Sequence, residues 1–213
     1  MERDIILIGG MPGSGKSRLG KSIADELRTE MSIEHLPIGD IIRAIGRGAI
    51  ESFYASEIRQ HLMGPNASEL IDNTVMYAVI DETLTAHAHT DHLMIDGYPR
   101  TLDQLDDLAE LASNDARTQV GAIVTVTNED TAVMRMIKRS PRDYEGALTV
   151  DWARTRIQRH IDNYTPVITT LHSRDTPITF VDTSGIKADT NLTGLKAIKT
   201  IIHQNRLNHP DIA

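Results

Sequence analysis

The chain has 213 residues, 40% of them hydrophobic and 24% charged, which is typical of a globular protein with one domain and an insertion, or two small domains. Its formal net charge of -8 argues against a general binder of nucleic acids or membrane surfaces, because such proteins need a basic face. The absence of cysteine excludes disulfides and thiolate zinc sites and suits a reducing compartment, and no apolar run approaches the ~20 residues of a membrane span.

The first elements read as strand, glycine-rich turn, helix and second strand. Ile5–Ile8 is a continuous apolar run of the kind found in strands that are buried on both faces. This run is too short for a secretory signal, so we expect a cytoplasmic protein. Apolar residues recur at helical spacing over 17–29, and a short strand is predicted over 32–38.

The turn between the first strand and helix matches a phosphate-binding loop. Gly10 to Ser17 fits the pattern G-x-x-x-x-G-K-[ST] in full. Glycines allow successive backbone N–H groups to point at one anion, and the following helix directs its N-terminal dipole there. Lys16 would supply a charge for the β- and γ-phosphates, and Ser17 a hydroxyl for Mg²⁺. A chance match in a glycine-rich turn is disfavoured by the order of strand, loop and helix.

Residues 39–84 carry only helical patterns. Helices are predicted over 41–45, 54–63 and 68–84, with Asp40 and Ser68 as N-caps. Because this is more helix than one crossover between strands requires, we predict a small helical insertion.

Strands and helices alternate in the remainder of the chain. Strands are predicted over 93–97, 119–126 and 177–181, and helices over 102–112, 129–139 (capped by Asn128), 151–171 and 192–207. Residues 140–150 are polar and predicted to form a loop, and Pro166 predicts a kink or break in its helix. The pattern predicts an α/β protein with a five-stranded parallel sheet, helices on both faces and ligands at the carboxyl ends of the strands.

A second motif follows the third strand. Asp96 ends an apolar run beside the phosphate loop, where an acid is expected to hold Mg²⁺ or its waters, although it could merely cap the next turn. Arg100 follows the rigid Pro99, and a fixed guanidinium there suits a bidentate grip on a phosphate. Farther along, Arg154, Arg156 and Arg159 cannot all face one way on a helix, and counting back from Pro166 favours Arg156.

These motifs make the chain resemble the adenylate kinase and nucleoside monophosphate kinase family. The matching pieces are Gly10 to Lys16, Gly39 to Arg43, Asp96 to Thr101 with Gln104, Arg135 with Arg139, and the helix from Arg156 to Pro166. They occur in family order from residue 5 to about residue 190. The resemblance implies a single P-loop kinase domain, with a core of residues 1–38, 85–139 and 151–213, an NMP-binding helical insertion of residues 39–84 and a short lid of residues 140–150.

The resemblance also implies site residues, a cofactor and partners. ATP with Mg²⁺ would be bound by Gly10, Pro12, Gly13, Ser14, Gly15, Lys16, Ser17, Arg18, Arg135 and Arg139, with Ser17 and Asp96 as the metal-binding residues. The acceptor monophosphate would be bound by Ile38, Gly39, Arg43, Ala67, Gly97, Arg100 and Gln104. The catalytic set would be Lys16, Arg100, Arg139, Arg142 and Arg156.

The resemblance finally implies a transferase of nucleotide biosynthesis. We expect a kinase that converts ATP and AMP into two ADP, works as a monomer and has no nucleic-acid or membrane partner. Ile38 stands where adenylate kinases have threonine, and Asn66-Ala67 where the family has an apolar pair along the acceptor base. A UMP/CMP-type kinase on the same fold, or a non-catalytic nucleotide-binding regulatory module, is the alternative.

Overall fold

The computed structural model describes residues 3–63, 69–143, 149–185 and 187–208, with the side chains of 119–120, 140–143 and 205–208 left out of the description. Five strands form one parallel sheet in the order β2-β3-β1-β4-β5. They are β1 (Asp4–Gly9), β2 (Ile33–Pro37), β3 (His92–Asp96), β4 (Thr118–Val126) and β5 (Ile178–Asp182). The five-stranded parallel sheet predicted from the alternating pattern is thereby confirmed.

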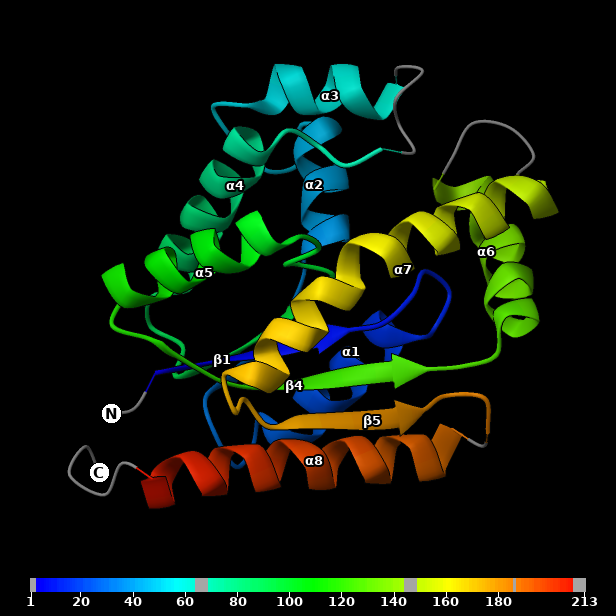
Figure 1. Ribbon diagram of the computed structural model, residues 1–213. Helices are drawn as coiled ribbons and strands as arrows, with labels where there is room; N and C mark the ends of the chain where they lie inside the picture. The colour runs from blue at the N-terminus through cyan, green and yellow to red at the C-terminus, as the bar shows by residue number, and fades with distance from the viewer. Residues whose placement is uncertain (1–2, 64–68, 144–148, 186, 209–213) are drawn as a thin grey trace.

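Helices cover both faces of this sheet (Figure 1). They are α1 (Lys16–Leu27), α2 (Ile38–Gly46), α3 (Ala55–Met63), α4 (Asn73–Ala86), α5 (Leu102–Asn114), α6 (Glu129–Asp143), α7 (Val150–Ser173) and α8 (Lys187–Asn208). The apolar run of β1 joins the two layers, because its side chains alternate between faces. Ile5 and Leu7 pack with the core under α4, α5 and α7, whereas Ile6 and Ile8 pack with the core formed by α1 and α8.

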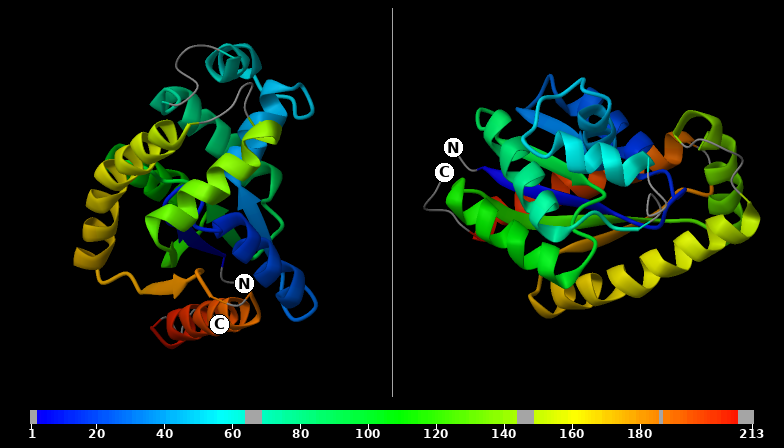
Figure 2. Two further views of the ribbon diagram at one scale, coloured as in Figure 1. Left: turned by 90° about the vertical axis from the view of Figure 1, so that its right-hand side faces the viewer. Right: turned by 90° about the horizontal axis from the view of Figure 1, so that it is seen from above.

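The longest helices run back along the sheet from its carboxyl end. Figures 1 and 2 show α7 and α8 on opposite faces, so that β1 begins and α8 ends at the same, amino end of the sheet. Helices α2, α3 and α4 lie between β2 and β3 in the chain, and α3 lies farthest from the sheet (Figure 1). Within the described ranges, no helix combines the length and apolar character needed to cross a bilayer.

Two predicted N-caps are wrong. Helix α2 already begins at Ile38 after Pro37, so Asp40 lies within its first turn, where its carboxylate accepts a hydrogen bond from Arg43 at 2.5 Å. Helix α4 begins at Asn73, and Asp72 caps it by accepting from the Thr74 N–H at 2.9 Å. The predicted start at residue 68 was too early, because Asp72 caps the helix and Leu70 before the cap lines the cavity described below.

Pro141, which was predicted to lie in a loop, and Pro166 both lie within helices. Helix α6 continues through Pro141 to Asp143, so the predicted loop of residues 140–150 is shorter than expected. Pro141 stands in the last turn, where the missing N–H removes a single hydrogen bond. Helix α7 is continuous through Pro166, so of the two predicted alternatives, a kink or a break, the break is wrong. Its buried Tyr164, Val167 and Leu171 pack on the main core, and this packing outweighs one lost backbone bond.

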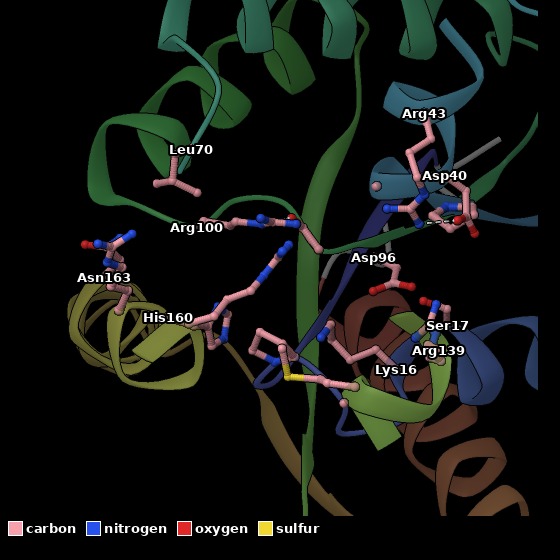
Figure 3. Close-up of a pocket in the computed structure, with 18 of the residues that line it drawn as sticks. Lys16, Ser17, Asp40, Arg43, Leu70, Asp96, Arg100, Arg139, His160 and Asn163 are labelled. Atoms are coloured by element: carbon pink, nitrogen blue, oxygen red, sulfur yellow. Dashed lines mark hydrogen bonds and ion pairs between the residues drawn. The ribbon is translucent and has the colours of Figure 1, made fainter. Parts of the chain in front are cut away.

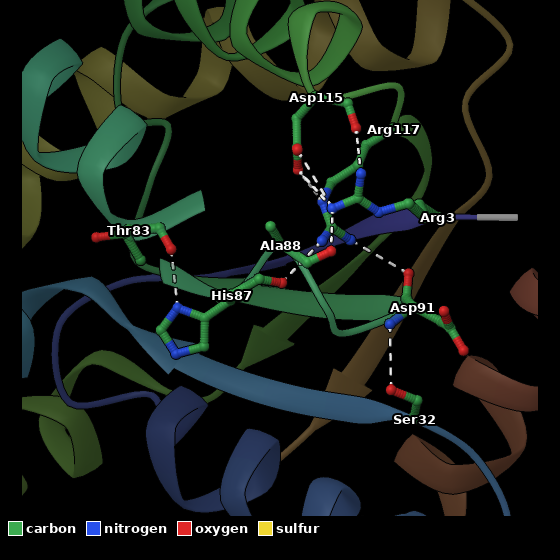
Figure 4. Close-up of polar contacts among 8 residues, drawn as sticks. All are labelled: Arg3, Ser32, Thr83, His87, Ala88, Asp91, Asp115 and Arg117. Carbon is green, nitrogen blue, oxygen red and sulfur yellow. Dashed lines mark hydrogen bonds and ion pairs between the residues drawn. The ribbon is translucent and has the colours of Figure 1, made fainter. Parts of the chain in front are cut away.

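A polar network ties the loops together at the amino end of the sheet (Figure 4). The Asp115 carboxylate accepts hydrogen bonds from Arg3 and Arg117. The same Arg117 guanidinium, which is 4% exposed as a residue, donates to the carbonyls of His87 at 3.0 Å and Asp91 at 3.3 Å. Because this end is closed by internal bonds, the carboxyl end of the sheet is left to bind ligands.

Candidate active site

A cavity of about 430 Å³ lies at the carboxyl end of the sheet. Its wall combines the phosphate loop and α1 with α2, the segment before α4, the β3–α5 loop, α6 and α7 (Figure 3). Segments that are far apart in the sequence therefore meet where ligands of parallel α/β sheets bind.

The phosphate loop is held rigidly between β1 and α1. Gly13 and Gly15 have φ values of 81° and 90°, in the left-handed region that favours glycine. A Cβ on Gly13 would collide with the backbone of Ala132 in α6. The Ser14 hydroxyl is 2.6 Å from the Thr125 hydroxyl, and the Ser14 carbonyl accepts from Thr183 at 2.5 Å. These bonds fix the loop backbone before any ligand arrives.

Lys16 lies across this loop, with Nζ donating to the carbonyls of Gly10 at 2.7 Å and Met11 at 3.1 Å. Burial lowers the pKa of Lys16 to about 8, while the charge of Asp96 acts to raise it and the charges of Arg100, Arg139 and Arg156 act to lower it. An anion placed among these cations would relieve the repulsion. The lysine therefore sits at the focus of a cationic site.

Asp96 ends β3 and faces the start of α1. Burial alone would raise the pKa of Asp96, but the hydrogen bond from His35, the charge of Lys16 and the hydrogen bond from Ser17 together hold it below its ordinary value. His35 Nε2 lies 3.3 Å from the carboxylate. An ionised carboxylate beside a serine hydroxyl fits Mg²⁺, which prefers oxygen ligands and is commonly held by one or two carboxylates and substrate phosphates.

The expected arginines approach the cavity from four elements. Arg43 comes from α2, Arg139 from α6, Arg156 from α7 and Arg100 from the β3–α5 loop, and all four line the cavity. Arg100 is oriented by its neighbours, because its Nε donates to the Gly97 carbonyl at 2.8 Å and its backbone N–H donates to Gln104 Oε1 at 2.9 Å. The rigid placement expected from the motif is thus provided by local hydrogen bonds.

Most of the residues expected at the site meet there. The cavity is lined by Pro12, Gly13, Lys16, Ser17, Gly39, Arg43, Asp96, Gly97, Arg100, Arg139 and Arg156. Gly10, Ser14 and Gly15 belong to the same loop.

Besides Gly10, Ser14 and Gly15 of the loop, four expected residues do not line the cavity. Ile38 and Gln104 are buried behind it, at 1% and 3% exposed. Arg135 donates to the carbonyls of Thr183 at 2.9 Å and Gly13 at 3.4 Å, which places it behind the loop. Arg18 reaches Asn191 of α8 at 3.5 Å. Ala67 and the Arg142 side chain lie outside the described part of the chain.

Several lining residues were missed in the sequence. Arg159, His160 and Asn163 line the cavity together with Arg156. They follow Arg156 by three, four and seven residues, which places them on the same helix face. The helical spacing was applied only to the arginines, so His160 and Asn163 were not predicted. Arg156 and Arg159 both face the cavity, and it is Arg154 that turns away, to Asp130 at 3.1 Å.

The segment before α4 supplies two further residues that the sequence analysis missed. Glu69 and Leu70 line the cavity, and Leu70 provides an apolar surface on the side of Arg100 (Figure 3). Both residues fall within the helix that the sequence pattern predicts over 68–84, and they were therefore not expected at the site. Leu70 therefore gives this side of the cavity an apolar surface.

Comparisons with known proteins agree with this geometry. A family model described as adenylate kinase matches residues 7–176. The chain is 29% identical over 194 residues to an adenylate kinase of Corynebacterium glutamicum (strain R), and 28% identical over 194 residues to one of Corynebacterium diphtheriae. Both alignments cover 91% of this chain and 98% of the relative. An adenylate kinase of Campylobacter hominis is 30% identical over 142 residues, covering 65% of this chain and 68% of the relative.

Proposed function

Since the chain belongs to the adenylate kinase family, we propose that it transfers the γ-phosphoryl group of ATP to AMP with Mg²⁺ and releases two molecules of ADP. The observation that carries this proposal is the convergence of Lys16 and four arginines from separate elements on one cavity, next to the ionised Asp96. Two nucleotides bring many negative charges together, and such a set of cations offsets their repulsion.

The proposed roles follow from phosphoryl-transfer chemistry. An oxygen of the acceptor monophosphate bonds to the γ-phosphorus while the bond from that phosphorus to the β–γ bridging oxygen breaks, so that the donor leaves as ADP. Lys16 contacts the β- and γ-phosphates, Arg43 and Arg100 hold the acceptor phosphate, and Arg139 and Arg156 surround the transferring group. Ser17 and Asp96 would hold Mg²⁺, which neutralises phosphate charge. No general base is required, because positioning and electrostatics supply the catalysis.

The hydrogen bonds of Gln104 support AMP as the acceptor. A backbone N–H can only donate, so the atom that accepts from Arg100 is the Gln104 oxygen, and this bond orients the amide. Because Gln104 is buried behind the cavity wall, its NH₂ group would meet the base only after a movement of that wall. Adenine N1 and cytosine N3 accept hydrogen bonds, whereas guanine N1–H and uracil N3–H donate them and would oppose this amide. Leu70 adds an apolar surface for a base. CMP is therefore the second candidate acceptor, and UMP and GMP are disfavoured.

A panel of acceptors tests the proposal. Initial rates with ATP, Mg²⁺ and each of AMP, CMP, UMP and GMP should give the highest kcat/KM for AMP, with CMP next. A preference for UMP or GMP would contradict the role of Gln104. Binding of ATP without transfer to any monophosphate would establish the non-catalytic regulatory module instead.

Other features of the proposal rest on the resemblance. We assign residues 39–84, with α2, α3 and α4, to acceptor binding, and residues 140–150 to a short lid that carries Arg142. Arg18 and Arg135 belong to the donor side as supports of the phosphate loop. A monomer in the cytoplasm stays a prediction.

A further inference from the structure

His160 is a residue of the cavity wall with no role so far. It stands one helical turn after Arg156 on α7, and Figure 3 shows it across the cavity from Asp40 and Arg43. Its Nε2 is buried and has no hydrogen-bond partner within the described part of the chain. A buried polar atom without a partner costs free energy, so such an atom at a binding site points to a ligand that completes the bond.

The imidazole ring is held in place by its neighbours. It stacks on Tyr164, one turn farther along α7, with 5.1 Å between ring centroids and 22° between ring planes. Tyr164 in turn fits against Gly9, since any side chain at position 9 would collide with the tyrosine hydroxyl. Gly9 leads directly into the phosphate loop. The ring is therefore fixed relative to the loop that carries Lys16.

The surroundings keep this ring neutral. Burial is the main cause that lowers the pKa of His160 to about 3, and the charges of Lys16, Arg100 and Arg156 add to it. These three cations come from α1, the β3–α5 loop and α7, and they are the groups assigned above to the donor phosphates, the acceptor phosphate and the transferring group. The imidazole thus lies among the cations that meet the transferring phosphoryl.

We propose that His160 is a further catalytic residue, which donates an Nε2–H hydrogen bond to an oxygen of the transferring phosphoryl group. This inference rests on the proposed function. In the free protein Lys16 is bonded to the carbonyls of Gly10 and Met11. In the proposed complex a phosphate would draw Lys16 away from these carbonyls, and one of its oxygens would lie beside Nε2.

A neutral donor suits this place for a physical reason. The site already holds several cations that repel one another, and another charge would add to that repulsion. A neutral N–H adds a directed bond without a charge. Because charge accumulates on the equatorial phosphoryl oxygens in the transition state, the bond strengthens there and affects kcat more than KM.

Three variants test the proposal. His160→Phe keeps a flat ring against Tyr164 but has no donor, whereas His160→Gln places an amide NH₂ near the position of Nε2. His172→Phe is the matched control, because it makes the same change at an exposed position of α7. Should His160→Phe fail to fold, His160→Asn replaces it. The asparagine amide lies at the position of Nδ1, so this variant also has no donor at the position of Nε2. Thermal unfolding checks that each variant folds.

The expected result is a selective loss of rate. His160→Phe should lower kcat by about 10- to 100-fold, with KM for ATP and AMP within about threefold of wild type. His160→Gln should stay within about threefold in kcat, and His172→Phe should match wild type. A kcat of His160→Phe within twofold of wild type, equal losses in the Phe and Gln variants, or a rise in KM at unchanged kcat would each overturn the proposal.

A binding measurement separates this inference from the proposed function. If wild type transfers phosphoryl to no monophosphate, the proposed function fails, and calorimetry with inorganic tripolyphosphate still tests His160. Affinity should fall by about tenfold in His160→Phe and be retained in His160→Gln. Equal affinities of wild type and His160→Phe would overturn the hydrogen bond whether or not the protein is active.

Discussion

At the scale of single residues, the site is built from groups whose protonation depends on one another. Burial acts against the charge of both Lys16 and Asp96, and each charge partly offsets that cost for the other. Asp96 stays ionised because His35 and Ser17 add hydrogen bonds. Burial is the main cause that lowers the pKa of Lys16 toward the physiological range, and three nearby arginines add to it. A bound anion would therefore stabilise the charged form of Lys16.

The lowered pKa of Lys16 predicts a pH dependence of activity. As pH rises through about 8, Lys16 of the free protein loses its proton, so kcat/KM for ATP should fall by roughly tenfold per pH unit above that value. Bound phosphates raise the pKa of the lysine, so kcat should stay level to higher pH. Initial rates between pH 6 and 10 measure both parameters. A kcat/KM that is unchanged up to pH 9.5 would contradict the assignment.

At the scale of elements, the phosphate loop is fixed by packing from three directions. Helix α6 approaches Gly13, the ends of β4 and β5 bond to Ser14, and α7 places Tyr164 against Gly9. Glycine at position 9 is required by tertiary packing and not by its own backbone, because its φ is not positive. The contact couples the loop to the helix that carries Arg156 and His160.

This contact predicts a compensating pair of substitutions. Gly9→Ala should reduce the free energy of unfolding by about 1–3 kcal/mol, because the new methyl group overlaps Tyr164. Tyr164→Leu should remove the overlap, so the double variant should be more stable than the sum of the two single losses by about 1 kcal/mol. Urea unfolding measures all three. Gly185→Ala is the control, since a Cβ there has open space, and strict additivity would refute the coupling.

At the scale of the whole molecule, a protein of net charge -8 concentrates positive charge at one place. Six basic side chains line the cavity, namely Lys16, Arg43, Arg100, Arg139, Arg156 and Arg159, against the acids Asp40, Glu69 and Asp96. They come from elements on different sides of the cavity, so we expect them to surround the substrates fully only when both are bound. Such an arrangement assembles the reactive site when both nucleotides are present and so protects ATP from water.

The fluorescence of the single tryptophan, Trp152, can be used as a probe of this joint closure around the two nucleotides. The Arg156 guanidinium lies 5.2 Å from the Trp152 ring centroid, and its movement to a phosphate would change that environment. Tryptophan fluorescence should therefore change more when ATP and AMP are both bound than with either alone. Arg156→Met should abolish the difference, while Arg174→Met, at an exposed position beyond α7, should keep it. Equal changes with one and with two nucleotides would argue against joint closure.

The local sequence determined much of the architecture and of the phosphate site. The apolar run of Ile5–Ile8 predicts a central strand, and the Gly10–Ser17 pattern places a loop and a helix after it. These signals are local, because burial periodicity and glycine conformations act over a few residues. The alternation of elements then places Asp96 at the same edge of the sheet.

Tertiary structure decided which side chains share the cavity. The sequence pattern predicts too early a start for α4, so that Leu70 was expected in a helix. It also did not predict that Arg159, His160 and Asn163 line the cavity. Pro166 remains within α7 because the core contacts of its neighbours outweigh a single lost hydrogen bond. The fit of Tyr164 against Gly9 joins residues more than 150 positions apart. Local periodicity contains no information on such distant pairs, since packing between separate elements creates them.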